Sequence, residues 1–438
     1  MNLQRLNLNT MKRKVGFKTL GCRLNQFETD ALASKFSDLG YEVVAESKDT
    51  DVFIVNTCTV TNQSDQKSRY VVNNALNKGH NGMLVITGCM ANHHKEKLEQ
   101  KYPNAYVVSN DQKSAIPELV AAHFNKEIVP SNQYVGGVFN YAPAAETFHT
   151  RSMIKIQDGC DNFCTFCIIP KVRGRAVSRP VEDVLENIKQ VIAFGYKEVV
   201  ITGVNISRYE YEGLKFSGLL KQILDLPFDF RVRISSIEPD GFDEAFFKLC
   251  DHPKMTPHLH LCLQSASEPI LLQMRRMYTY KSYIRIVERL RRMNPLFNIT
   301  TDLIVGFPGE TDQDFEVSLK ALDELQFGHV HTFKYSRRED TRAARMSNVV
   351  NEKIKKDRSE VLRSKALNSK MAFQQKLIGT TQKVLVETIN GNWAEGYGEY
   401  YAPVKIAGEK ITKNQFYKVR IKDMLIDDGE PYLVGDLV

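Results

Sequence analysis

The sequence lacks any long apolar run, lacks a recognisable export signal and carries little net charge for its 438 residues. A membrane-spanning helix needs about 20 mainly apolar residues, so the absence of such a run excludes a predicted membrane span. The first fourteen residues, MNLQRLNLNTMKRK, have no apolar core like that of a secretory signal peptide. We therefore expect a disordered tail there, in a cytoplasmic protein. The net charge of +7 permits a polyanionic partner without requiring one.

Cysteine, by contrast, is well represented, with eight residues. Without an export signal, they indicate a reducing compartment, where cysteines more often bind metals or take part in redox chemistry than form disulfides. Three of them form a C-x3-C-x2-C array in GCDNFCTFC, directly after the predicted strand SMIKIQ: Cys160, Cys164 and Cys167.

This array suits an iron–sulfur cluster better than structural zinc. Thiolates bind both, but structural zinc takes four protein ligands, and no other cysteine or histidine lies between His149 and Cys250. Three thiolates on a four-iron cluster leave one iron open, whereas a ferredoxin-type cluster uses a fourth cysteine in a different spacing. The pattern therefore predicts a [4Fe-4S] cluster with one iron open to a substrate or cofactor.

A second set of cysteines is dispersed in sequence but similar in setting. Cys22 ends the predicted strand VGFKTLG, Cys58 ends DVFIVNT and Cys89 ends MLVITG. Each falls at a strand-to-helix turn, and parallel strands bring such turns to one edge of a sheet, where open α/β folds bind ligands. We therefore predict a second cluster site, again with one iron that the protein does not ligate.

The chain shows three kinds of segment. The first third alternates β-branched strands with helices, which predicts parallel βαβ units in an open sheet. After a linker over 128–148, a second β/α alternation predicts a partial (β/α)6 barrel with its chemistry at the C-terminal strand ends. The last segment has short strands and turns only, which predicts a small closed β-barrel. The six strands of the second segment are predicted at 152–157, 197–202, 230–236, 258–265, 299–306 and 329–336, and the three expected domains cover 14–127, 146–372 and 375–438.

The remaining cysteines and the paired histidines have weaker patterns. Cys250 and Cys262 have no cysteine partners nearby and are predicted to be buried thiols. In each histidine pair the two rings share one face of a strand; the pairs are His258 with His260 and His329 with His331. A metal site is one interpretation, but ring packing or hydrogen bonding at the barrel mouth is the favoured one.

One stretch of the chain is strongly basic. From Lys334 to Lys383 there are fourteen lysines or arginines against five acidic residues. This stretch is expected to form a basic helix plus a linker, and either a solvated helix face or RNA contact would account for it.

Several motifs, in order along the chain, resemble those of the methylthiotransferases of the radical S-adenosylmethionine superfamily. They are TLGCRLNQFET, NTCTVT, GCMAN, IQDGCDNFCTFCIIPKVRGRAVSR, TGVNIS, QSAS and TDLIVGFPGET. The resemblance covers nearly the whole chain, and the terminal barrel resembles the TRAM domain, which is associated with RNA binding. One departure is Ala266 in QSAS, where the family pattern has glycine.

The resemblance implies two [4Fe-4S] clusters and two molecules of S-adenosylmethionine per turnover. One molecule would methylate a sulfur at the cluster of Cys22, Cys58 and Cys89, and the other would yield a radical that removes hydrogen from an unactivated carbon. The residues expected near S-adenosylmethionine are Phe166 and, at the ends of predicted strands, Gly203, Ser235, Ser236, Val305 and Gly306. Gly306 could equally be a turn former.

Among the family's groups, TLGCRLNQFET most resembles the one acting on N6-threonylcarbamoyladenosine at position 37 of tRNA, at C2 of the base. Isopentenyladenosine 37 and a ribosomal-protein side chain are the alternative substrates. The expected partners are the tRNA anticodon stem-loop, an electron donor such as flavodoxin or ferredoxin, and a sulfur source. Arg173, Arg175 and Arg179 could pair with phosphate or a substrate carboxylate, or instead with Glu182 and Asp183.

Two readings from other classes remain open. The chain could be a non-catalytic iron–sulfur protein that binds RNA or transfers electrons, although an open iron argues against this. It could also be a zinc-stabilised RNA-binding module.

Overall fold

Residue contacts divide the chain into two units. The first comprises Met1–Phe148 with Lys171–Arg173, and the second comprises His149–Pro170 with Gly174–Val438. The computed structural model describes residues 12–44, 50–77, 82–127, 136–145, 149–408 and 410–438. Most of the predicted tail, and part of the predicted linker over 128–148, lie outside these residues. Within the described residues, no helix is both long and apolar enough to cross a membrane.

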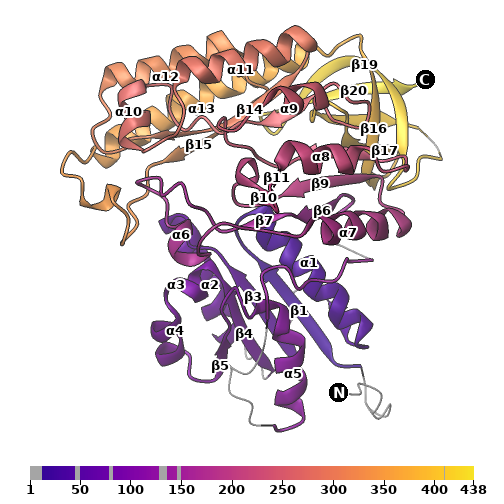
Figure 1. Cartoon of the computed structure of the whole chain (residues 1–438). Helices are drawn as coiled ribbons and strands as arrows, with labels where there is room; N and C mark the ends of the chain where they lie inside the picture. Colours follow the sequence, from indigo (N-terminus) through magenta and orange to yellow (C-terminus); the bar gives the residue numbers. More distant parts are fainter. Residues whose placement is uncertain (1–11, 45–49, 78–81, 128–135, 146–148, 409) are drawn as a thin grey trace. The chain divides into compact units, whose positions relative to one another are not determined.

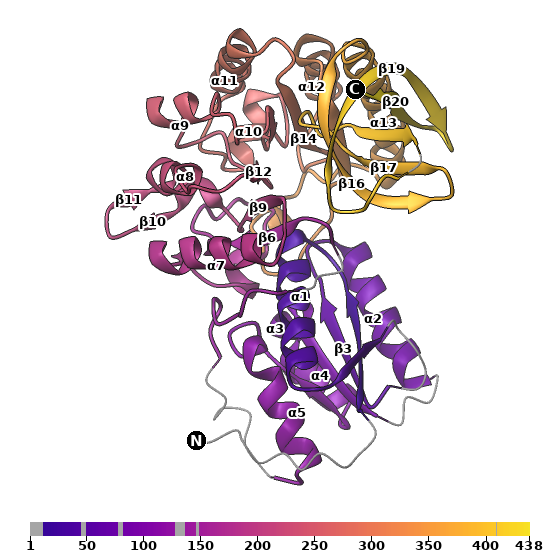
Figure 2. The same cartoon turned by 90° about the vertical axis from the view of Figure 1, so that its right-hand side faces the viewer.

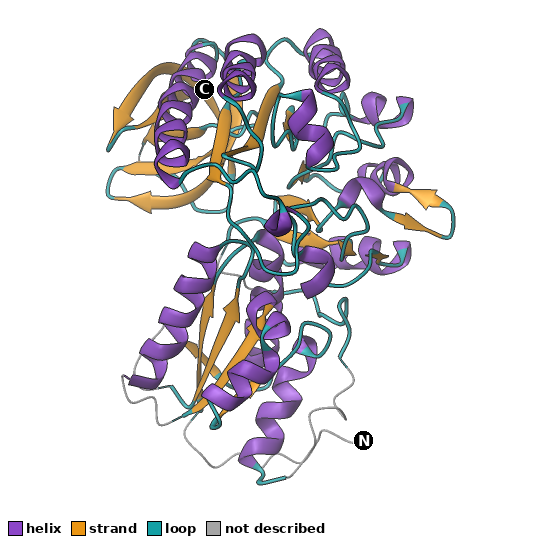
Figure 3. Cartoon of the chain, turned by 90° about the vertical axis from the view of Figure 1, so that its left-hand side faces the viewer, coloured by secondary structure: helices purple, strands orange, loops and turns teal. Residues whose placement is uncertain are grey.

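The first unit is built on a five-stranded parallel sheet in the order β2-β1-β3-β4-β5 (Figure 1). Its strands are β1 (Lys14–Thr19), β2 (Glu42–Val44), β3 (Val52–Thr57), β4 (Met83–Gly88) and β5 (Ala105–Val107). Every residue of β3 and β4 is buried, because helices lie on either side of these strands (Figure 3). The predicted open parallel sheet is confirmed.

The helices of this unit follow β1, β3, β4 and β5 along the chain. They are α1 (Arg23–Asp38), α2 (Asn62–Asn77), α3 (Cys89–His93), α4 (Lys95–Lys101) and α5 (Ile116–Phe124). Leu24, Phe27 and Ala31 of α1 are buried at spacings of three and four, so they share one helix face. The described part of the predicted linker belongs to this unit, since the Tyr141 ring packs edge-on against Phe27 at 5.6 Å.

The second unit contains the predicted partial barrel. Its parallel strands form two sheets, β12-β9-β6 and β13-β14-β15, which are connected by isolated parallel bridges such as Ile237 with Leu261. The strands are β6 (Ser152–Lys155), β9 (Glu198–Thr202), β12 (Arg231–Ile234), β13 (His258–His260), β14 (Asn298–Val305) and β15 (His329–Lys334). Strand β13 is shorter than the predicted 258–265.

Helices cover the outside of this barrel and complete its core. They are α7 (Val181–Ala193), α8 (Phe216–Leu224), α9 (Glu244–Leu249), α10 (Glu268–Gln273), α11 (Tyr280–Met293), α12 (Asp312–Leu325) and α13 (Glu352–Gln375). Helix α11 shows the pattern well, because Tyr283, Val287 and Leu290 are buried on one face. Their side chains join the same apolar cluster as Leu259 and Leu303 of the strands.

The C-terminal strands close into the predicted small barrel, in the order β16-β17-β18-β20-β19. They are β16 (Thr381–Asn390), β17 (Trp393–Tyr397), β18 (Pro403–Ala407), β19 (Phe416–Asp427) and β20 (Glu430–Leu437). Phe373 of α13 and Leu377 just beyond it belong to this barrel's apolar core, and Figure 2 shows the helix beside these strands. Arg231 of β12 ties the two barrels together by donating to the Lys383 carbonyl at 2.7 Å and the Tyr397 carbonyl at 3.2 Å.

Candidate functional site

The three dispersed cysteines follow neighbouring strands of the first unit at their C-terminal ends. Cys22 is the N-cap of α1 beyond β1, Cys58 follows β3, and Cys89 begins α3 after β4. Because β1, β3 and β4 are adjacent and parallel, the thiols gather at one edge of the sheet, as predicted. Cys22 is exposed, whereas Cys58 and Cys89 are buried.

Gly21 holds the loop of Cys22 against Cys58. Its φ of +96° lies in the left-handed region that favours glycine, and an added Cβ would meet the Cys58 Cβ at 2.7 Å and its Sγ at 2.8 Å. A larger residue would therefore displace Cys58 or the loop itself.

A buried ionic network lies beside these cysteines in the first unit. The Glu28 carboxylate accepts from Lys113 Nζ at 2.5 Å and from Arg173 Nη1 at 3.0 Å, and all three side chains are at most 1% exposed. Arg173 also donates to the Asn25 side-chain oxygen at 2.7 Å, and Asn25 donates to the Thr57 carbonyl at 3.0 Å. The network therefore reaches the residue before Cys58.

The charges of this network suit an anionic group. Burial raises the pKa of Cys89 to about 11; the Arg173 and Lys113 cations oppose the shift, and the Cys22 and Cys58 thiols add to it. Two cations against one carboxylate leave a positive surplus among buried groups, which lowers the cost of holding thiolates there. The donor set therefore fits an anionic cluster bound by three thiolates.

The second unit presents its three cysteines on the loop after β7 (Gln157–Asp158). Cys160, Cys164 and Cys167 are all partly buried, and the Cys167 N–H donates to the Cys164 carbonyl at 3.0 Å, which curls the loop. Burial raises the pKa of Cys167 to about 12, the other two thiols add to the shift, and Arg276 opposes it.

Two polar side chains of the second unit contact these sulfurs. Arg276 donates from Nη1 to Cys164 Sγ at 3.1 Å and forms an ion pair with Glu238. Asn205 lies with its Nδ2 3.8 Å from Cys160 Sγ. Hydrogen bonds to ligating sulfurs tune the potential of an iron–sulfur cluster, so these residues are candidates for that role.

The spacing of the thiols can be compared with that of a zinc site. Among the described residues, no three cysteine sulfurs lie within 4.8 Å of one another. Zinc–sulfur bonds of about 2.3 Å in a tetrahedral site hold neighbouring sulfurs about 3.8 Å apart. Among the described residues, the cysteine sulfurs are therefore not arranged as a tetrahedral zinc site.

Comparison with known proteins gives the family. Residues 154–322 match the Radical SAM superfamily, and residues 14–109 match Uncharacterized protein family UPF0004. Over 430 residues the chain is 35% identical to threonylcarbamoyladenosine tRNA methylthiotransferase MtaB of Thermotoga maritima, covering 97% of this chain and 98% of that protein. The chain belongs to the radical S-adenosylmethionine methylthiotransferases. As a radical S-adenosylmethionine enzyme, it uses S-adenosylmethionine and a [4Fe-4S] cluster.

Relatives in this methylthiotransferase family are named for two nucleosides. MtaB of Bacillus subtilis strain 168 is 34% identical, and the alignment covers 97% of this chain and 96% of that protein. The tRNA-2-methylthio-N(6)-dimethylallyladenosine synthase of Endomicrobium trichonymphae is 31% identical, and the alignment covers 96% of this chain and 99% of that protein. Among solved structures, the radical S-adenosylmethionine methyltransferase TsrM of Kitasatospora setae aligns with a TM-score of 0.55 at 17% identity, covering 76% of this chain and 77% of TsrM, which supports the fold.

The residues predicted to contact S-adenosylmethionine in this methylthiotransferase lie at strand ends of the second unit or on the cysteine loop. Phe166 packs against Phe307, with ring centroids 6.5 Å apart. Gly203 follows β9, and Ser235 and Ser236 follow β12, where Ser235 Oγ lies 3.3 Å from Thr202 Oγ1. The positions of these residues are known, but their contacts with S-adenosylmethionine stay predictions.

Val305 and Gly306 lie at the end of β14, and Gly306 has a structural role there. Its φ is +73°, and its N–H donates to Glu310 Oε2 at 2.6 Å. An added Cβ would collide with the Lys355 side chain. The turn-former interpretation of Gly306 is therefore confirmed, while its contact with the cofactor stays a prediction.

Of the two acidic residues proposed as partners of the three arginines, Asp183 acts on Arg179, where its charge opposes the lowering of the Arg179 pKa by burial. Arg173 bonds to Glu28, Arg175 to Asp161 at 2.7 Å, and Arg179 to the Asn187 side chain at 2.8 Å. Arg173 and Arg179 are buried, but Arg175 has a 74% exposed side chain and stays available for an anion.

Other predicted features can be placed as well. Cys250 and Cys262 are buried, as predicted. Helix α13 covers the middle of the basic stretch. Part of the helix's charge is neutralised by the ion pairs of Lys365 with Asp323 and Lys370 with Glu430. Those pairs favour a solvated, salt-bridged helix face over RNA contact by these two lysines.

Several residues of both sites were missed in the sequence. Lys113 and Arg276 stand in no motif that suggests a role, and Glu28 lies in the motif TLGCRLNQFET, where the sequence gave no reason to single it out. The partners of all three residues lie far away along the chain. Asn205 could have been found, since it is part of the motif TGVNIS that also supplied Gly203.

Proposed function

We propose that this methylthiotransferase inserts a methylthio group at C2 of N6-threonylcarbamoyladenosine at position 37 of tRNA. The observation that carries the proposal is the pair of three-cysteine sites. One lies at the C-terminal strand ends of the parallel sheet in the first unit, and the other lies on the loop that follows β6 and β7 in the second unit. Methylthio insertion at an unactivated carbon combines hydrogen removal with sulfur delivery, so it calls for two such sites. The names of the relatives in Thermotoga maritima, Chlamydia pneumoniae and Bacillus subtilis support the choice of nucleoside.

In this proposal the cysteines divide the work between two [4Fe-4S] clusters. The ligands are Cys160, Cys164 and Cys167 for one cluster and Cys22, Cys58 and Cys89 for the other. When bound, the clusters supply the electron that cleaves S-adenosylmethionine and the sulfur that is transferred. Arg276 donates a hydrogen bond to the first set, and the Lys113 and Arg173 cations balance the thiolate charge of the second.

S-adenosylmethionine binds, in the same proposal, at the C-terminal strand ends of the partial barrel, and two molecules are used per turnover. The residues placed around it are Phe166, Gly203, Ser235, Ser236, Val305 and Gly306. Chemistry at this end of the strands is the rule for β/α barrels.

The substrate would be gripped through the anticodon stem-loop. An unpaired base in such a loop can leave its stack and enter a protein pocket at modest cost. We assign RNA binding to the small barrel over 375–438, sulfur delivery to the domain over 14–127 and radical generation to the domain over 146–372. A flavodoxin or ferredoxin would supply electrons, and a separate sulfur source would refill the second site.

The test is anaerobic and uses reduced, cluster-reconstituted enzyme with S-adenosylmethionine. Three tRNA substrates are compared: unmodified, threonylcarbamoylated and isopentenylated at position 37, with nucleosides measured by mass spectrometry. A methylthio gain on the threonylcarbamoylated tRNA alone is the expected result.

Other outcomes separate the alternatives. A methylthio gain on the isopentenylated tRNA instead would make N6-isopentenyladenosine the substrate in place of N6-threonylcarbamoyladenosine. This would agree with the name of the relative from Endomicrobium trichonymphae. Release of 5′-deoxyadenosine without any nucleoside product would overturn the tRNA substrate and direct the search to ribosomal protein. No 5′-deoxyadenosine at all would favour the non-catalytic reading.

A further inference from the structure

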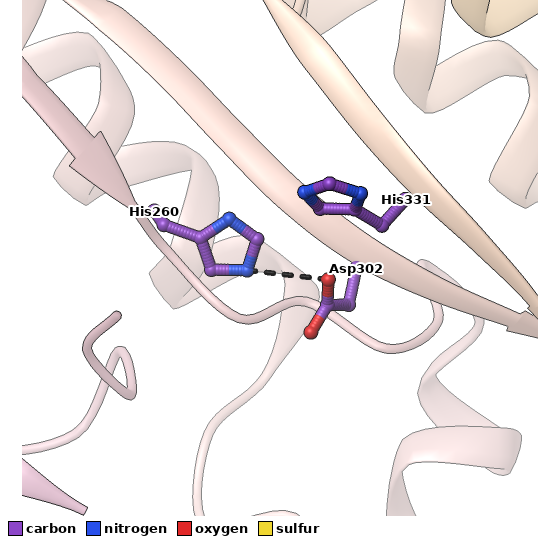
Figure 4. Close-up of side chains that lie close together, drawn as sticks. All are labelled: His260, Asp302 and His331. Atoms are coloured by element: carbon purple, nitrogen blue, oxygen red, sulfur yellow. Dashed lines mark ion pairs between the residues drawn. The ribbon is translucent and has the colours of Figure 1, made fainter. Parts of the chain in front are cut away.

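A cluster of ligand-type side chains lies inside the partial barrel and has no part in the proposed chemistry. It consists of His260 on β13, Asp302 on β14 and His331 on β15, whose side chains face one another in Figure 4. One ligand atom from each lies within 4.8 Å of the other two, and no other group of three His, Cys, Asp or Glu among the described residues meets this condition.

The strand register explains why the three side chains meet. Asp302 is directly paired with His331 in the ladder of β14 and β15, and His260 is paired with Thr300, two residues before Asp302 on the same strand face. The apolar neighbours Leu259 and Leu303 point the other way, into the core. The alternation of the strands therefore places both imidazoles and the carboxylate on the inner face of the barrel.

The spacing of the ligand atoms suits a bound cation. His260 Nε2 lies 3.3 Å from Asp302 Oδ1, which is longer than the 2.7–2.9 Å or so of a charge-assisted hydrogen bond. Two ligands held by a tetrahedral ion through bonds of about 2.0 Å lie about 3.3 Å apart. The 3.3 Å separation of this pair matches that of two neighbouring ligands around one ion, and the remaining pairs of ligand atoms lie within 4.8 Å.

Each imidazole is also oriented by a neighbour through one ring nitrogen. Thr300 Oγ1 lies 3.1 Å from His260 Nδ1, and His329 Nε2 lies 3.2 Å from His331 Nδ1. Metal-binding histidines typically have such a partner, which fixes the ring and leaves the opposite nitrogen directed at the ion. The predicted ring packing and hydrogen bonding are present, with the His260 and His331 rings 5.7 Å apart. The same contacts orient the two rings for a metal ion, so they do not exclude the metal interpretation.

We propose that His260, Asp302 and His331 bind one divalent transition-metal ion of the zinc class, separate from the iron–sulfur clusters. Two imidazoles and one carboxylate are a ligand set that zinc accepts, and three protein ligands leave a coordination position for water or a substrate oxygen. Ions can reach the site, because His331 is exposed and the Asp302 side chain is 27% exposed.

The test measures zinc in the full-length, cluster-loaded protein after anaerobic incubation with zinc sulfate and removal of loosely bound ions with a chelating resin. Zinc is counted by plasma mass spectrometry, and its ligands are determined by X-ray absorption at the zinc edge. The expected result is about one zinc per chain with nitrogen and oxygen ligands at about 2.0–2.1 Å and no sulfur shell at about 2.3 Å.

Variants assign the ion to the site. His331→Ala and Asp302→Asn should each lose most of the zinc while keeping the iron and sulfide content of the parent. His123→Ala, which removes an exposed histidine of the first unit, should keep it. Absence of retained zinc, a sulfur shell around it, or retention of zinc by both site variants would each overturn the proposal. None of these outcomes depends on the tRNA substrate.

Discussion

At the scale of single residues, the two cysteine sites differ in how far the sequence could reveal them. The cysteines were predicted because each stands at the end of a predicted strand or in a dense motif. The contacts of their supporting residues were not predicted, since Arg173 lies 145 positions from Glu28 and Arg276 lies 112 positions from Cys164. Hydrogen bonds and ion pairs over such separations depend on the folded chain path, and a single sequence carries no local pattern for them.

Gly21 gives a residue-scale prediction with a matched control. Replacing Gly21 by alanine should place a Cβ against Cys58 and disturb the first unit's cysteine site. Gly40 has a similar φ of +86°, but nothing lies within 4 Å of an added Cβ, so Gly40→Ala introduces the same kind of backbone strain without the collision.

The measurement is iron and sulfide per chain after reconstitution. Gly21→Ala should lose up to about half of the iron, that of one of two four-iron clusters, while Gly40→Ala keeps it. Equal losses in the two variants would mean that backbone strain, not contact with Cys58, is responsible.

At the scale of elements, the strands were predicted well and their ends less well. Buried parallel strands are short, apolar and β-branched, so β3, β4 and β14 stand out in the sequence. Strand β13 ends at His260, although apolar residues continue to Leu263 and the strand was predicted to reach residue 265. Beyond it, Leu261 forms only an isolated bridge and Gln264 has a φ of +66°, a backbone conformation that apolar patterning does not reveal.

The N-terminal ends of β9 and β12 carry an ionic cluster that connects the two barrels of the second unit. Glu198 is fully buried and accepts from Arg231 at 2.5 Å and from Arg233 at 2.8 Å. Burial alone would raise the pKa of Glu198, but Arg231, Arg233 and Arg151 outweigh it and lower the value to about 2. Arg231 in turn holds carbonyls of the small barrel.

From this ionic cluster we predict that the connection between the partial barrel and the small barrel weakens at acidic pH. The pKa of Glu198 is lower in the folded state than the 4.5 of an unperturbed glutamate, so its contribution to stability is present above about pH 4.5 and is lost as pH falls toward about 2. Glu198→Gln should cost about 3–5 kcal/mol near neutral pH, because it leaves buried arginines without their carboxylate.

The readout is urea denaturation followed by fluorescence of Trp393, the single tryptophan, which lies in β17 of the small barrel. The difference between parent and Glu198→Gln should narrow as the pH is lowered. Glu244→Gln, which removes an exposed partner of Arg289, should have little effect at any pH. A constant difference from pH 7 to pH 3 would contradict the assigned role of Glu198.

At the scale of the whole molecule, two parallel α/β architectures each carry one cysteine site. The sequence predicted both, because strand–helix alternation and the position of cysteines at strand ends are local properties. It gave no hint that Lys171–Arg173 would group with the first unit, since the segment sits inside the motif of the second.

Removing each cysteine set in turn tests the division of labour. Changing Cys160, Cys164 and Cys167 to alanine should abolish 5′-deoxyadenosine production. Changing Cys22, Cys58 and Cys89 should leave that production measurable but abolish methylthio transfer. Both variants are assayed for 5′-deoxyadenosine, methylthiolated nucleoside and iron. If the second variant also fails to make 5′-deoxyadenosine while keeping about four irons, the two sites do not act separately.

The path of the chain between the units limits how such an enzyme could be assembled from parts. The boundary is crossed after residue 148, again after Pro170 and once more after Arg173. A gene fragment that ended at residue 148 would encode the whole sheet of the first unit but not Arg173. Of the two ion pairs that Glu28 makes with Lys113 and Arg173, it would keep the one with Lys113 and lose the one with Arg173. A single recombination point at residue 148 would therefore separate Arg173 from the rest of the first unit.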